Sequence, residues 1–130
     1  MEYDKIITEL VSQNKELEGR IAFLEFRLEL LFENSNISKL LFESKITREQ
    51  YSEIIALMDD LRNKLDNQQK VNHVEYESKI SEITGNHDYH FAESVAKAFM
   101  EDRRWEEVFP ALYGDFPKYE NYLENVDHKQ

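Results

Sequence analysis

A heptad repeat at the start of the chain constrains its fold more than any other sequence feature. With residue 7 at position a, four consecutive heptads keep phase without interruption, and all four d positions are leucine. A 3.5-residue period keeps one narrow apolar stripe facing a neighbouring helix. We therefore expect a coiled coil between copies of the chain. Its eight a and d residues, called the seam from here on, are Ile7, Leu10, Asn14, Leu17, Ile21, Leu24, Leu28 and Leu31.

Polar residues in and beside the seam refine this prediction. Asn14 occupies an a position, where a buried amide specifies register and strand number at some cost in stability. The alternative is that Asn14 lies at a frayed end of the coil. Arg20 at g and Glu25 at the following e are placed to pair across a parallel interface.

A second apolar face begins after Gly19. Ala22, Phe23, Phe26 and Leu30 lie on the side away from the seam, so this part of the helix can pack on its own subunit. Residues 2–18 lack such a face and are expected to project outwards. The predicted division is a coiled-coil extension over 1–19, a helical body over 20–123 and a flexible tail over 124–130.

Composition places the whole chain in the all-α class. Only three Gly and two Pro occur in 130 residues, which leaves little turn chemistry. The absence of cysteine excludes disulfides, thiolate catalysis and Cys-based metal sites. We see neither a secretory signal pattern nor an apolar run that could cross a bilayer, so we expect a cytoplasmic protein without membrane contact.

Capping residues predict the helices that follow the coil. A short helix over Ile37–Glu43 comes first, after a polar break. Thr47 then opens a capping box, with Ile46 and Tyr51 as the hydrophobic pair around it. The core positions expected on that helix are Tyr51, Ile54, Ile55, Met58, Leu61 and Leu65.

The second half of the chain should hold further helices. Asn72 with Glu75 is a second box, opening a helix that ends at Thr84 before Gly85. Asp88 should cap a helix over 89–101, and Asp102 should cap the next one. Pro110 should break or restart that helix, and Gly114 should end it. The C-terminal tail should dock on the body at least as far as Leu123.

The chain is acidic, with a formal net charge of −11. Residues 34–70 carry six acids and six bases, whereas residues 71–114 carry nine acids and four bases. Because phosphate backbones attract Lys and Arg, direct nucleic-acid binding is disfavoured. The acidic excess indicates a solvated surface or, as the sharper hypothesis, an acidic docking face for a protein partner.

Three groups of motifs stand out along the chain: Arg20-Ile21 with Leu24-Glu25-Phe26 and Leu30-Leu31, the Ile46-Thr47-Arg48-Glu49 box, and His90 with Ala98-Phe99 and Trp105 to Phe109. Together they resemble the small, uncharacterised YhaI-type proteins of bacilli. The resemblance covers about residues 20–118 and leaves out 1–19. It implies a multihelical subunit in an intertwined homo-oligomer, a trimer. The family has no assigned activity, so no functional residue carries over.

The residues beside the seam indicate how many helices the coiled coil contains. Ile at a with Leu at d favours a dimer, but Ile6, Val11 and Phe32 at g and e widen the apolar stripe and suit three helices better. We therefore place a trimer ahead of a dimer.

One group of side chains has residue types that could bind a metal ion. His87 and Asp88 precede His90, which shares a helix face with Glu93 at the i, i+3 spacing of carboxylate metal sites. A metal site of this kind needs further ligands from other helices. The structural interpretation is that Asp88 is an N-cap and His90 a half-buried surface residue, and we adopt it, with no catalytic residue, metal or cofactor expected.

The basic and aromatic residues have structural interpretations too. Arg103 and Arg104 are surrounded by acids at 101, 102, 106 and 107, so local salt bridges are expected, and Trp105 should belong to the core. Without a basic groove, the tyrosines that could stack on bases indicate core or interface positions: Tyr51, Tyr113, Tyr119 and Tyr122.

The sequence therefore favours an interaction protein rather than an enzyme. The leading hypothesis is a homo-oligomeric helical module that presents an acidic surface to an unidentified protein partner. One alternative is a metal-dependent hydrolase that uses His87, Asp88, His90 and Glu93. The other is an acidic, phage-borne inhibitor that mimics nucleic acid, although Lys and Arg interrupt most of the acidic runs.

Overall fold

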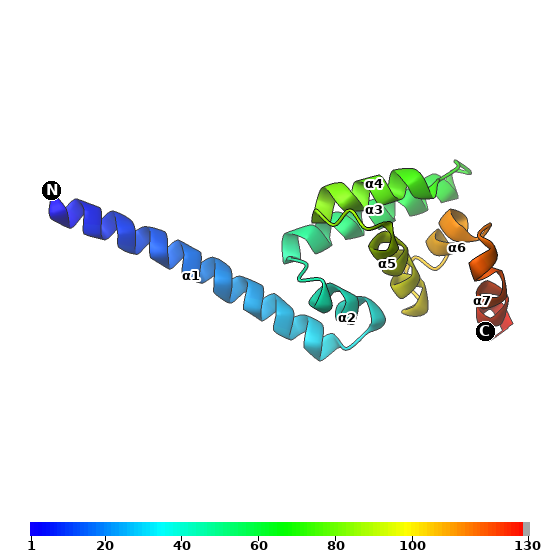
Figure 1. The fold of residues 1–130 in the computed structure, drawn as a ribbon, viewed down its shortest axis with the longest axis horizontal. Coiled ribbons are helices and arrows are strands. Elements are labelled where there is room, and N and C mark those ends of the chain that lie inside the picture. Colours follow the sequence, from blue (N-terminus) through cyan, green and yellow to red (C-terminus); the bar gives the residue numbers. More distant parts are fainter. Residues whose placement is uncertain (129–130) are drawn as a thin grey trace.

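A computed structural model describes residues 1–128, without the side chains of residue 121 and of 124–128. Within this range the chain forms seven α-helices, which confirms the all-α prediction. Figure 1 shows one long helix, α1, leading to a body built from the others. The helices are α1 Glu2–Glu33, α2 Asn36–Glu43, α3 Arg48–Asp66, α4 His73–Thr84, α5 Tyr89–Glu101, α6 Val108–Tyr113 and α7 Pro117–His128.

Capping residues set most of these boundaries, as predicted. The Thr47 hydroxyl accepts a hydrogen bond from the Gln50 backbone N–H, and the Gln50 side chain accepts one from the Thr47 N–H, which completes a capping box. Asn72 caps α4, and Gly85 ends it at a positive φ of 74°. Such a left-handed C-cap suits glycine because it has no Cβ to clash.

The body packs around α5. This helix contacts α2, α4 and α6, and its buried residues occupy most of its circumference, as expected of a helix enclosed by others. The predicted core residues Phe91, Val95, Ala98 and Phe99 are all buried. On α3 the predicted core positions are buried or half-buried, and Leu57 is a buried residue that the prediction missed.

The expected role of Asp102 is wrong. Asp102 ends α5, and its carboxylate accepts hydrogen bonds from the backbone N–H groups of Asn36 and Ile37, at 3.0 and 2.8 Å. It therefore caps α2, which lies 66 residues earlier in the sequence, rather than the next helix. This contact ties the start of α2 to the end of α5.

The last two helices follow the predicted turn residues. Pro110 lies in the first turn of α6, where its missing N–H is not needed for an intrahelical bond. Gly114 ends α6, and a Cβ there would lie 2.4 Å from the Pro110 carbonyl oxygen, so only glycine fits. Tyr119, Tyr122 and Leu123 of α7 pack against the core. The predicted flexible tail over 124–130 lies outside the described side chains.

Candidate functional site

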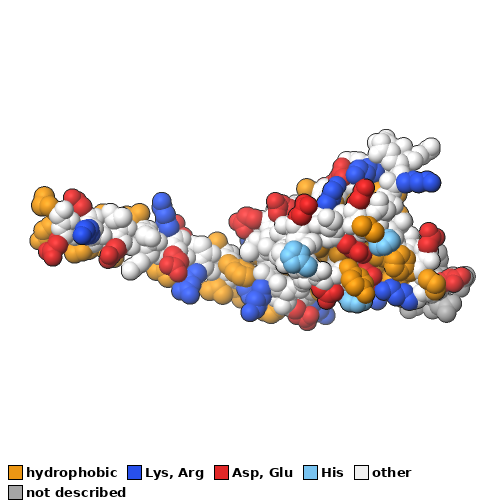
Figure 2. Space-filling model, turned by 45° about the horizontal axis from the view of Figure 1, so that its top comes forward, with side chains coloured by type: hydrophobic (Ala, Val, Ile, Leu, Met, Phe, Trp, Pro, Cys, Tyr) orange, Lys and Arg blue, Asp and Glu red, His pale blue; other side chains and the backbone are white. Residues whose placement is uncertain are grey.

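The seam residues of α1 lie at the surface of the subunit. All eight are exposed, and the seven apolar ones leave between 51% and 65% of their surface accessible. Figure 2 shows hydrophobic side chains along α1 where it extends from the body. A row of exposed leucines and isoleucines along one helix is characteristic of a protein interaction surface. The seam is therefore the main candidate functional site.

The first part of α1 has no support from its own body. Every residue from 1 to 22 is exposed, and Figure 1 shows this part of the helix extending away from the other helices. In folded proteins most of the stability of a helix comes from packing of its apolar face rather than from intrinsic helix propensity. The body of the chain therefore leaves the apolar face of residues 2–22 uncovered.

The end of α1 packs on the body through the face opposite the seam. Phe26 and Leu30 are each only 3% exposed, and Phe23 is half-buried, as the second apolar face predicted. Ala22 was expected on this face but is exposed, because it lies one turn before the helix meets the body. The seam thus remains free along the whole of α1, including the part that contacts the body.

The residues beside the seam differ in how they are held. Ile6 and Val11 are about half exposed, and Phe32 is 91% exposed. Arg27, in contrast, is held by α2. Its guanidinium donates a hydrogen bond of 3.0 Å to the Phe42 carbonyl and lies 3.9 Å from the centroid of the Phe42 ring.

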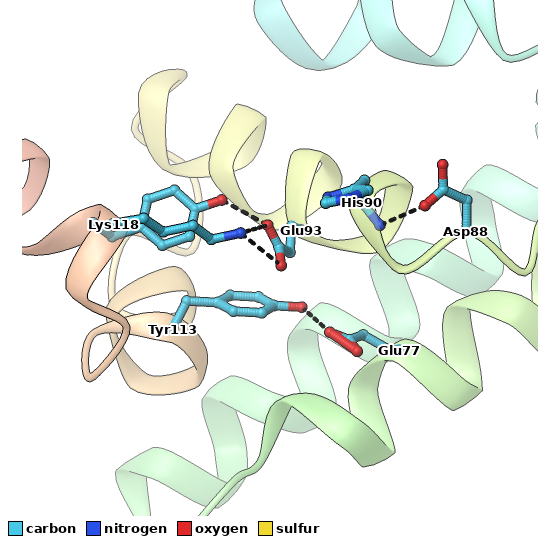
Figure 3. Close-up of polar contacts among 7 residues, drawn as sticks. Glu77, Asp88, His90, Glu93, Tyr113 and Lys118 are labelled. Atoms are coloured by element: carbon cyan, nitrogen blue, oxygen red, sulfur yellow. Dashed lines mark hydrogen bonds and ion pairs between the residues drawn. The ribbon is translucent and has the colours of Figure 1, made fainter.

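The cluster of His87, Asp88, His90 and Glu93 makes contacts that stabilise the fold. The Asp88 carboxylate accepts a hydrogen bond of 3.0 Å from the His90 backbone N–H, so it caps α5 as predicted. The His90 side chain is exposed, rather than half-buried as expected. Figure 3 shows Asp88 directed at the backbone of His90, whereas Glu93 points toward Lys118.

Glu93 is the one buried carboxylate of this cluster, at 4% exposure. Its oxygens accept hydrogen bonds from the Lys118 ammonium at 3.0 Å and from the Tyr119 hydroxyl at 2.6 Å. Burial raises the pKa of Glu93, but the bonds from Tyr119 and Lys118 outweigh it, so the net pKa is lowered. Glu93 therefore joins α5 to α7.

A second carboxylate pairs with a buried tyrosine nearby. The Tyr113 hydroxyl donates a hydrogen bond of 2.8 Å to Glu77, which Figure 3 also shows. Burial and this negatively charged acceptor both raise the pKa of Tyr113, so it stays protonated. This pair connects α4 to α6, and Tyr113 keeps its proton near neutral pH.

His87 contacts Ser81 rather than the other members of the predicted cluster. Its Nδ1 atom forms a hydrogen bond with the Ser81 hydroxyl at the edge of a shallow pocket. The pocket has a volume of about 270 Å³, which is below the roughly 300–1,000 Å³ of typical small-molecule sites. Within residues 1–128, no three His, Asp or Glu side chains that are described are placed to hold a metal ion.

The basic and aromatic cluster differs in part from its prediction. Trp105 belongs to the core, as expected, and its indole N–H donates a hydrogen bond of 2.9 Å to Asp59. Arg104 was expected to form a local salt bridge. Its guanidinium instead lies over the rings of Phe99 and Trp105 and donates a hydrogen bond to the Tyr51 hydroxyl.

Many carboxylates of the acidic segment 71–114 bind groups of the same chain. At least six of the nine accept hydrogen bonds from backbone or side-chain donors: Glu77, Asp88, Glu93, Glu101, Asp102 and Glu107. These contacts hold the helices together, so much of the negative charge has a structural purpose.

The chain has no match among protein-family models, curated proteins or solved structures. The resemblance to YhaI-type proteins therefore remains a prediction from the residues that carry it. Among the described helices, none has both the length and the apolar character needed to cross a bilayer.

Proposed function

We propose that the chain is a homo-oligomeric interaction protein in which α1 holds the copies together and the body binds a protein partner. The observation that carries the proposal is the exposed seam, whose seven apolar residues are more than half accessible in the single chain. Burying a Leu or Ile side chain fully is worth roughly 1.5–3 kcal/mol. The subunit on its own lacks part of this stabilisation at each of the seven apolar seam positions.

A second copy is the occupant that best fits the seam. The a and d residues repeat without a break over four heptads, and such a stripe is complementary to itself, because each side chain inserts between four residues of the facing helix. The body gives further support, because it packs on the opposite face of α1 through Phe26 and Leu30 and leaves the seam clear.

A trimer is the preferred assembly, ahead of a dimer. Ile6, Val11 and Phe32 extend the exposed apolar surface beyond the a and d stripe. Three helices bury such flanking positions more fully than two. The body would then be displayed in several copies, which raises the effective affinity for a partner that can contact more than one of them. We propose no catalytic activity for this assembly.

Substitution of one seam residue tests the proposal. Leu17→Glu places a charge in the middle of the seam and should reduce the mass in solution to that of one chain, 15.6 kDa. Ser12→Glu introduces the same charge on the outer face of α1 and should leave the assembly intact. Because residues 1 to 22 lie clear of the body, both variants should retain a folded body.

Light scattering and the fluorescence of Trp105 provide the two measurements, for mass and for folding of the body. A Leu17→Glu variant that keeps the wild-type mass would contradict the proposal. So would loss of assembly in both variants, because it would show that the seam is not the contact surface.

A further inference from the structure

Phe32 is an unusual residue for the surface of a folded protein. It is 91% exposed, at the last turn of α1, one residue before the helix ends at Glu33. The C-cap residue Asn34 has a positive φ of 53° and donates its N–H to the Leu30 carbonyl, so the helix end is well defined. Phe32 is thus presented on a regular helix, at the e position directly beside the seam residue Leu31.

Arg27 lies at a g position, on the other side of the seam. Its guanidinium is bound to the Phe42 carbonyl, lies 3.9 Å from the Phe42 ring centroid and 5.5 Å from that of Phe23. The body therefore fixes a half-buried cation at the base of the coil before any partner arrives. A preorganised side chain loses less conformational entropy when a partner binds.

The heptad pattern relates these two residues. In a parallel, in-register coil, each g residue faces the e residue that follows five positions later on the partner helix, as it does for Arg20 and Glu25. Applied along α1, the same rule gives four complementary pairs: Ile6 with Val11, Gln13 with Glu18, Arg20 with Glu25, and Arg27 with Phe32. The first pair is apolar, the second polar, the third ionic and the last a cation facing an aromatic ring.

The opposite orientation lacks this complementarity. In an antiparallel coil e faces e and g faces g, so Glu18 and Glu25 would oppose each other. Arg20 would then lose its acidic partner, and Arg27 would no longer meet an aromatic ring. Like charges placed opposite one another are one of the means by which coiled coils reject a wrong orientation.

We propose that α1 pairs in parallel and in register with α1 of a second copy, and that Arg27 of each copy binds the Phe32 ring of its neighbour. This proposal rests on the self-association proposed above. The guanidinium of Arg27 then lies between the Phe42 ring of its own chain and the Phe32 ring of the next. All bodies lie at the same end of the coil, because Figure 1 places the body at the C-terminal end of α1.

Single cysteines test the orientation, since the chain contains none of its own. In a parallel coil Ile7→Cys brings two thiols together, and oxidation should yield a covalent dimer on a non-reducing gel. Ser12→Cys, on the outer face, is the control and should stay uncrosslinked. If instead Ile7→Cys crosslinks only when mixed with Leu31→Cys, the coil is antiparallel and the proposal is overturned.

A double-mutant cycle tests the contact between Arg27 and Phe32. Phe32→Leu keeps an apolar side chain without the ring and should raise the dissociation constant roughly two- to fivefold per contact. Phe32→Tyr keeps the ring and should bind as the wild type does. In an Arg27→Met background the Phe32→Leu effect should disappear, and equal effects in both backgrounds would overturn the proposed contact.

The outcomes separate this inference from the proposed function. Sedimentation of the wild-type chain as a monomer would overturn both. An oligomer that crosslinks only between Ile7→Cys and Leu31→Cys would retain the proposed self-association and overturn the parallel arrangement.

Discussion

The stalk, residues 2–22 of α1, and the body differ in where their apolar side chains lie. Leu10 in the stalk is 53% exposed, whereas Leu41 in α2 is fully buried. Both leucines lie on regular helices of the same chain. The body satisfies its apolar residues within one subunit, while the stalk leaves them accessible. The comparison indicates that the body is stabilised by its own core, whereas the chain itself does not cover the apolar side chains of the stalk.

Among the changes that test the difference between stalk and body, deletion of residues 1–18 should have the largest effect on stability. The truncated chain loses the seam contacts of Ile7, Leu10 and Leu17, each worth roughly 1.5–3 kcal/mol when fully buried. It keeps Ile21 to Leu31 of the seam, so we expect a folded oligomer with a lower thermal midpoint. Circular dichroism and sizing measure both properties.

A monomeric product of this deletion would show that the first two heptads drive assembly. An unfolded product would show that the body depends on the stalk, which contradicts the division drawn here.

A matched pair of leucine substitutions should sharpen the comparison. Leu41→Ala creates a cavity in the body and should lower its free energy of unfolding by about 2–5 kcal/mol. Leu10→Ala removes an exposed side chain and should leave unfolding of the body unchanged while weakening association. Urea titration followed by fluorescence of Trp105, the single tryptophan, reports on the body alone.

If Leu10→Ala destabilised the body as strongly as Leu41→Ala does, stalk and body would be one cooperative unit. Stalk and body would then differ in where their leucines lie but not in how they are stabilised.

The smallest expected effect concerns the contact of Glu93 with α7. Because the pKa of Glu93 is lowered in the folded chain, its contribution to stability is complete above the ordinary glutamate pKa and is lost as the pH falls through the lowered value. The effect is small because the Lys118 side chain is 48% exposed and solvent screens the pair.

Thermal midpoints of the wild type and Glu93→Gln, measured across the acid range, check this prediction. The difference between the two proteins should narrow as the pH falls. A difference that does not depend on pH would mean that the charge of Glu93 contributes nothing.

The helix boundaries could be predicted because their causes are local. Thr47, Asn72 and Asp88 cap helices within three residues of themselves, and such patterns are visible in the sequence. The seam could be found for the same reason, since its residues recur along one helix. The exposure of the seam followed from its narrow period, which differs from that of a core-facing helix.

Contacts between helices could not be predicted in the same way. Periodicity shows which face of a helix is buried but not which helix covers it. Asp102 caps α2 across 66 residues, and Glu93 meets Tyr119 on another helix. Arg104 lies on aromatic rings that folding brings around it, although neighbouring acids in the sequence indicated salt bridges. Each depends on the arrangement of the body as a whole.

Sedimentation equilibrium of the chain of residues 1–130 is the most direct test of self-association through the seam. At micromolar concentration we expect a mass of three subunits, or two if the seam forms a dimer, of 15.6 kDa each. The mass should fall toward one subunit on dilution, because association is concentration-dependent. A mass of 15.6 kDa at every concentration would contradict the account, because the exposed seam would then have no partner of its own kind.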